Sequence, residues 1–286
     1  MFWKTQPRIG KKIALKTRYT FLIAALGLAS PRQILAASDA LVRDAYLMDW
    51  KTDGILTPVA IGVFGLGQWA SSNLDRYQGG YEKSKLLPWD RPFAGTLNDK
   101  ADVVSTLLCG AAVAPVAIAL LDWHEGLLGR NDVATQILML SQILGLEAGL
   151  NHAARGLAWW PRPLVYNKQE NLSDLSNDMA SSFYSGHASG AFAAAVFTGV
   201  WYDKTHPDNS NSAWVWAGGM TIATSIAALR VVSGQHYPTD VVAGALMGSL
   251  IGYAIPKLHE NAANKNSTVA FDLAPIPGGA MLLTRF

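Results

Sequence analysis

Residues 102–121 read DVVSTLLCGAAVAPVAIALL and form the most continuous apolar segment of the chain. Asp102 at its start is the only charged residue in it, and Ala, Val, Leu and Ile make up most of the rest. About 20 mostly apolar residues are enough to cross a bilayer as a helix. Strands are usually much shorter, so this segment predicts a helix in an apolar environment.

Other apolar segments on both sides of residues 102–121 are also too long for strands and rich in Ala, Leu and Met, which favours helices. They are residues 55–72, 134–150, 188–202, 213–229 and 240–255. We therefore expect an all-α bundle of about six core helices. Glu147 and Pro58 interrupt two of the segments, and the mean hydropathy of the chain is only +0.16. We accordingly expect only residues 102–121 to approach a full span, in a bundle that is membrane-embedded or membrane-associated.

The composition excludes some classes of function. Charged residues make up 15% of the chain, and 23 Lys and Arg against 21 Asp and Glu leave a net charge of +2. No basic field large enough for nucleic-acid binding is present. The single cysteine, Cys109, has no internal disulfide partner and is expected to be a packed core thiol.

The two ends of the chain differ from its middle. Residues 1–20 carry several Lys and Arg and no acid, and FLIAALGLA and small residues follow, which predicts a signal peptide or signal anchor over 1–38 that leaves residue 40 onward outside the cytoplasm. We divide the rest into an N-terminal helical region (39–100), a core (101–258) and a tail (259–286). Two short apolar runs around PIPGG predict a β-hairpin in the tail.

The first of three motifs is RGLAWWPRP, residues 155–163. Arg155 and Arg162 are about two helical turns apart, so both could face one side if the helix continued, although Pro161 and Pro163 oppose that. Two guanidiniums can hold a phosphate in bidentate fashion. A solvated basic loop is the alternative interpretation.

The second motif places Ser185, Gly186 and His187 directly before the apolar segment 188–202. A helix N-terminus presents free N–H groups and partial positive charge, which together favour an anion. The serine hydroxyl can add a hydrogen bond, and His187 can supply a proton to a leaving group. A simple serine cap beside a surface histidine is the alternative.

The third motif is LRVVSGQHYPTD, residues 229–240. Arg230 ends one apolar segment, and Pro238 fits the first turn of the next helix. Asp240 follows His236 by four residues, so its carboxylate can orient the imidazole and leave the other ring nitrogen as a nucleophile. An aspartate that serves only the helix dipole is the alternative. If an even number of segments crosses the membrane between loop 151–187 and this loop, the two loops lie on the same side.

The three motifs in this order resemble the type 2 phosphatidic acid phosphatase / vanadium haloperoxidase superfamily. Its signature is K-x6-R-P, then P-S-G-H, then S-R-x5-H-x3-D. The resemblance covers about residues 100–255. Arg155 stands where the family has lysine, Tyr184 where it has proline, and Leu229 where it has serine. None of these changes removes a residue that reacts, so an active enzyme is expected.

The resemblance implies a metal-independent phosphatase without cofactors. His236 would be the nucleophile, oriented by Asp240, and His187 the general acid and base. The remaining motif residues would bind the substrate phosphate: Arg155, Arg162, Ser185, Gly186 and Arg230. A phosphohistidine would form and then be hydrolysed. No HExxH or CxxC pattern suggests a metal site.

A phosphorylated lipid is the favoured substrate because apolar segments flank all three motifs, and Trp159 and Trp160 fit a membrane interface. A small phosphoester cleaved by a soluble periplasmic acid phosphatase is the main alternative. A vanadate-dependent haloperoxidase and a non-catalytic envelope protein are further ones. The expected location is the bacterial cell envelope, at the inner membrane or in the periplasm, with the site outside the cytoplasm.

The other histidines match no part of the motifs and are expected in loops or at the surface, with His152 near the first motif. They are His124, His152, His206 and His259.

Overall fold

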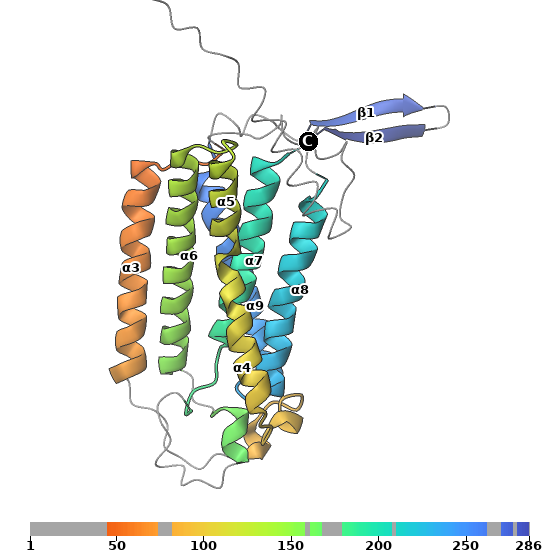
Figure 1. Ribbon diagram of the computed structural model, residues 1–286. Helices are drawn as coiled ribbons and strands as arrows, with labels where there is room; N and C mark the ends of the chain where they lie inside the picture. Colours follow the sequence, from red (N-terminus) through yellow and green to blue (C-terminus); the bar gives the residue numbers. More distant parts are fainter. Residues whose placement is uncertain are drawn as a thin grey trace, which may run out of the picture.

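The computed structural model describes residues 45–73, 82–157, 161–167, 179–207 and 210–261, and the backbone of 270–276 and 279–285 (Figure 1). Its long helices are α3 (Trp50–Asn73), α4 (Asp99–Leu108), α5 (Ala114–His124), α6 (Arg130–Leu157), α7 (Gly186–Thr205), α8 (Ser212–Val232) and α9 (Pro238–His259). Short 3-10 helices are η1 (Lys83–Lys85), η2 (Arg91–Phe93), η3 (Cys109–Val113) and η4 (Pro163–Tyr166). The predicted signal segment 1–38 lies outside the described residues, as do Trp159 and Trp160.

Each predicted apolar segment is helical, so the prediction of an all-α bundle is confirmed. The segment 102–121 is divided between α4 and α5 by η3. Pro115 lies near the start of α5. The N–H groups of the first helical turn have no acceptor within the helix, so the missing N–H of proline costs no hydrogen bond there. Cys109 is a free thiol at this break and only partly buried, so the expectation of a fully packed core thiol was wrong.

More helices than expected are long and apolar enough to cross a membrane. They are Trp50–Asn73, Asp99–His124, Arg130–Leu157, Ser212–Val232 and Pro238–His259. The expectation that only residues 102–121 approach a span was therefore wrong, because the helices extend beyond the apolar segments. Helix α6, for example, has 28 residues, about 42 Å of helix.

Helix α7 occupies the centre of the bundle, between α6, α8 and α9 (Figure 1). Phe197 and Trp201 of α7 are fully buried against Met139 and Ile143 of α6 and Ile255 of α9. Large apolar side chains here exclude water from the helix interfaces and stabilise the bundle.

The interface of α7 with α9 is unusually close. A Cβ atom at Gly244, Gly248 or Gly252 would lie 2.5, 2.0 or 2.4 Å from a carbonyl oxygen of α7 or its N-cap. Only glycine leaves room for backbones at this separation, as in other close helix pairs of membrane proteins. The row of glycines therefore fixes α9 along α7, which starts at one functional motif while α9 starts at another.

The chain ends in a short antiparallel hairpin of β1 (Ala270–Ile276) and β2 (Gly279–Arg285). Ala270 pairs with Arg285 and Ile276 with Gly279. The predicted hairpin in the tail is therefore confirmed.

The ends of α6 and α8 and the starts of α7 and α9 lie at one end of the bundle, which we call the site end (Figure 1). The start of α3 lies at the opposite end. All three motifs therefore share one end.

Two histidines expected at the surface are in fact buried at the opposite end. His206 is 8% and His259 is 2% exposed. Asp122 pairs with the first and Asp53 with the second. Tertiary contacts with helices distant in sequence produce this burial, which the local polar sequence does not reveal.

Candidate active site

The first motif divides between a helix end and an extended segment. Arg155 lies in the last turn of α6, and the helix stops at Leu157. Arg162 has extended backbone and is nearly buried, and its amide donates to the carbonyl of Met179 at 3.0 Å. The two arginines therefore do not share a continuous helix, and loop contacts position Arg162.

The second motif is a capped helix start. Ser185 is the N-cap of α7, and its hydroxyl oxygen accepts from the amide of Ala188 at 3.4 Å. Gly186 approaches α6 closely, since a Cβ there would lie 3.0 Å from Oδ1 of Asn151. The Asn151 amide donates to the Tyr184 carbonyl at 2.6 Å, so α6 also holds the preceding turn. His187 thus follows a firmly fixed helix N-terminus.

The third motif is a tight turn between α8 and α9. Gly234 has a φ of +77°, which favours glycine, and it packs against the Thr96 carbonyl. The amides of Gln235 and His236 both donate to the Arg230 carbonyl at 3.2 Å. This turn brings His236 back beside the guanidinium-bearing end of α8.

The side chain of His236 is buried and held on one nitrogen. Its Nδ1 donates to the carbonyl oxygen of Ser182 at 2.8 Å, while the Asp240 carboxylate is 3.7 Å from the same nitrogen. Asp240 accepts instead from the Ser182 hydroxyl and from the Tyr237 amide, the latter at 2.8 Å. The bonding partners of Nδ1 assign the proton to it and leave the Nε2 lone pair available.

Asp240 also connects two motifs through its backbone. Its carbonyl oxygen accepts from the amide of Ser185 at 3.1 Å. The start of α7 and the start of α9 are therefore joined by a main-chain bond at the point where their functional residues lie.

A polar network holds the two buried arginines. Arg230 donates through Nη1 to the carboxylate of Asp102 and, at 3.2 Å, to the Ser105 hydroxyl. Gln235 donates to the same carboxylate at 3.2 Å and accepts from Nη1 of Arg162. Gln235 thus links both guanidiniums, which is how a cationic pocket can be held in shape.

The electrostatics favour a neutral imidazole at His236. Burial, together with the positive charges of Arg162 and Arg230, lowers its pKa to about 4, while Asp240 opposes this shift. Because only the neutral form carries a lone pair, this environment suits a nucleophile in a cationic pocket.

Sequence reasoning missed Ser182, Asp102 and Gln235. Asp102 and Arg230 are 128 residues apart, so no spacing rule joins them. The position of Asp102 as the only charged residue in the apolar segment 102–121 was the one available signal in the sequence. Ser182 contributes through a backbone carbonyl, which no residue pattern reveals.

Comparison with known proteins agrees with the motifs. Residues 137–263 match the sequence model of the PAP2 superfamily, and all the predicted site residues lie in this range. This part of the chain is therefore similar to the PAP2 superfamily, which agrees with the resemblance of the three motifs.

A relative with a curated description is a lipid A 1-phosphatase of Porphyromonas gingivalis. It is 36% identical to this chain over 73 residues, which are 26% of this chain and 15% of the relative. The match thus spans a small part of that protein. No solved structure matches the chain.

Proposed function

We propose that the protein is a membrane phosphatase that removes phosphate from a lipid through a phosphohistidine at His236. The observation that carries this proposal is the position of His236, which is held through Nδ1 and buried, with the charges of Arg162 and Arg230 lowering its pKa. The similarity to the PAP2 superfamily and the membrane-length helices support a phosphatase acting at a lipid surface. The partial relative, named for lipid A, supports the same substrate class.

The proposed reaction has two steps. In the first, Nε2 of His236 attacks phosphorus, the bond to the leaving oxygen breaks, and His187 donates a proton to that oxygen. In the second, His187 removes a proton from water, which displaces the phosphate from His236. Arg162, Arg230 and Arg155 offset the negative charge of the phosphate oxygens, as positioning and charge stabilisation dominate phosphoryl transfer.

The helix N-terminus has a separate role in this scheme. Ser185 and the Gly186 amide would donate hydrogen bonds to a phosphate oxygen, and the dipole of α7 points its positive end at the anion. Asp240 would act on His236 through Ser182 as well as by its charge, since its carboxylate bonds the Ser182 hydroxyl. The reaction proposed in this way needs no metal ion.

The orientation of the site has a geometric constraint. The start of α3 and the site lie at opposite ends of the bundle. If α3, the broken helix from α4 to α5, α6, α7, α8 and α9 all cross the membrane, the start of α3 and the site cannot both lie outside the cytoplasm. We propose the outward-facing site. The start of α3 then lies on the cytoplasmic side, which is also the side that the Lys and Arg of residues 1–20 favour.

The decisive experiment follows phosphate release and the phosphoenzyme. Purified protein is supplied with phosphatidic acid, phosphatidylglycerol phosphate, polyprenyl diphosphate, lipid A and an aryl phosphate. We expect turnover that persists in EDTA, and an acid-labile phosphoenzyme with a ³²P-labelled substrate. His236→Ala is expected to abolish both, a loss of about 10⁴- to 10⁶-fold in kcat.

His259→Ala, at the buried histidine of the opposite end, is the matched control and should retain turnover per folded molecule. Turnover retained by His236→Ala would refute the nucleophile, and turnover lost in EDTA would refute the metal-free reaction.

A further inference from the structure

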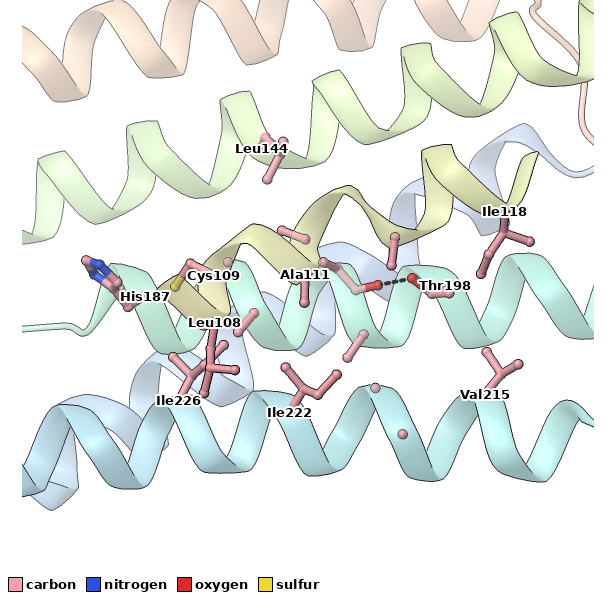
Figure 2. Close-up of a pocket in the computed structure, with 18 of the residues that line it drawn as sticks. Leu108, Cys109, Ala111, Ile118, Leu144, His187, Thr198, Val215, Ile222 and Ile226 are labelled. Carbon is pink, nitrogen blue, oxygen red and sulfur yellow. Dashed lines mark hydrogen bonds between the residues drawn. The ribbon is translucent and has the colours of Figure 1, made fainter. Parts of the chain in front are cut away.

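An apolar groove starts at His187 and runs along α7 between α6, α8 and the broken helix of α4, η3 and α5 (Figure 2). Its volume is about 460 Å³, within the range of sites for small molecules. Gly186 and His187 line one end, and Thr198 and Val215 line the other. The groove is thus continuous with the proposed site of phosphate transfer.

The lining of this groove offers almost nothing to a polar ligand. None of the described residues that line it is Asp, Glu, Lys or Arg. The Thr198 hydroxyl donates to the Ala194 carbonyl at 2.6 Å, so this hydroxyl is already satisfied (Figure 2). Leu108, Ile222 and Ile226 project into the space. A hydrocarbon gains most from such a surface.

Small residues give the groove its depth. On α8, a Cβ added at Gly218 would meet no atom within 4 Å. On α7, a Cβ added at Gly190 would meet only the Glu147 carboxylate, at 3.8 Å. Gly218 lines the groove and is exposed, so a larger side chain there would enter open space without displacing backbone.

The length of the groove matches a lipid chain. Twelve residues of α7 separate Gly186 from Thr198, which is about 18 Å of helix. The hydrocarbon core of a bilayer is about 30 Å thick, so a chain in one leaflet reaches about 15 Å. A lipid whose phosphate lies at His187 could therefore place one extended chain along the whole groove.

The groove also opens toward the surroundings of the bundle. Trp214 is 54% exposed at its far end, and Gly218 is exposed along its side. Part of the groove is therefore accessible from outside the bundle, where the chain of the proposed lipid substrate would lie.

We propose that this groove binds one hydrocarbon chain of the substrate and that Gly218 determines how long a chain it holds. The inference rests on the proposed lipid phosphatase function. It adds that this groove is the part of the molecule that contacts the lipid tail. The occupant is a single chain, because the groove follows one helix away from one proposed phosphate site.

The test uses the full chain in detergent with single-chain substrates, a series of lysophosphatidic acids of increasing chain length, and glycerol 3-phosphate. For the wild type, kcat/KM is expected to rise about fourfold per added methylene until the groove is full, and then to level off. Gly218→Leu should bring the plateau to shorter chains and lower kcat/KM for the longest chain by about tenfold or more. Gly218→Ala should show the same change to a smaller extent, with little risk to folding.

Gly62→Leu is the matched control, because Gly62 is an exposed glycine of α3 with no atom within 4 Å of its added Cβ. It should keep the wild-type chain-length profile. An unchanged profile in both Gly218 variants, or an equal loss at every chain length, would overturn the groove assignment while leaving the phosphatase intact.

A wild type that hydrolyses neither this series nor any lipid of the substrate panel above would instead contradict the proposed function. Binding of unreactive alkylphosphonates by calorimetry would then judge the groove alone: chain-length-dependent affinity reduced by Gly218→Leu supports it, and equal affinity at all lengths overturns it.

Discussion

The two ends of the bundle each bury a histidine beside an aspartate, and the two pairs differ in one respect. At the opposite end, Nδ1 of His259 contacts the Ile255 carbonyl at 2.9 Å and Nε2 contacts Asp53 at 2.8 Å. At the site end, Nδ1 of His236 bonds Ser182, and no described residue bonds its Nε2. In the proposed mechanism, the pair at the opposite end is structural because both nitrogens are engaged, and the pair at the site end can react because Nε2 is open.

The second pair at the opposite end supports this distinction. His206 has the Thr205 hydroxyl 2.8 Å from Nδ1 and the Asp122 carboxylate 3.4 Å from Nε2. The Tyr202 ring stacks on it at 4.1 Å. Every side of this imidazole is occupied, and no arginine is among these partners.

The largest expected effect is a difference in kcat between variants of Asp240 and of Asp53. Asp240→Asn removes the charge that stabilises His236 and disturbs its bond with Ser182, so kcat should fall about 10³- to 10⁴-fold with the protein still folded. Steady-state phosphate release measures it. Asp53→Asn is the matched substitution and should leave kcat per folded molecule near the wild-type value. Equal losses in both variants would remove the distinction between the ends.

The next effect concerns stability. His259→Ala leaves the Asp53 carboxylate without its imidazole and should lower the free energy of unfolding by about 3 kcal/mol, toward the lower end for a buried pair because Asp53 is partly exposed. Thermal inactivation in detergent measures it. A loss of kcat without a loss of stability would show that this pair also serves the reaction.

A smaller effect is expected at the residue that connects Asp240 to His236. Ser182→Ala removes the hydroxyl but keeps the carbonyl that accepts from Nδ1. We expect kcat to fall about tenfold, as for other residues that orient a reactive group through a hydrogen bond. An unchanged KM would agree with a positioning role, whereas a rise in KM alone would contradict it.

The smallest effect is on pH dependence. The pKa of His236 is about 4 in the folded protein against about 6.5 for an unperturbed histidine. The neutral form is thus favoured by folding, and its contribution to stability is present above about pH 6.5 and is lost as the pH falls toward 4. Protonation of the nucleophile should lower kcat/KM only near pH 4, once the ionisation of the substrate is accounted for. An acid limb near 6.5 that Asp240→Asn shifts would contradict this.

The sequence predicted the helices well because each is marked by a long apolar segment. It also placed the three motifs at one end, since the count of helices between them is even. Prolines at 161 and 163 correctly indicated that α6 ends before Arg162. Local signals such as these depend on only a few neighbouring residues.

Partners distant in the chain were not predictable in the same way. Asp102 reaches Arg230 only because α4 packs on α8, and His259 meets Asp53 only because the start of α3 lies beside the end of α9. The expected contact of Asp240 with His236 is a 3.7 Å approach, with Ser182 between them in the hydrogen-bond network. Such contacts depend on the packing of helices, which a single sequence does not specify.

The row of glycines on α9 limits which parts of the protein can vary when substrate preference changes. Gly244 to Gly252 hold α9 so close to α7 that any larger side chain along this seam would separate Ser185 from Asp240. For the proposed lipid substrate, substitutions that change lipid preference are therefore not expected on this side of α7. The opposite wall is formed by η3, α5 and α8, and no backbone lies this close to Gly218. We therefore expect natural variants with altered lipid preference to differ in that wall, while Gly244, Gly248 and Gly252 stay the same.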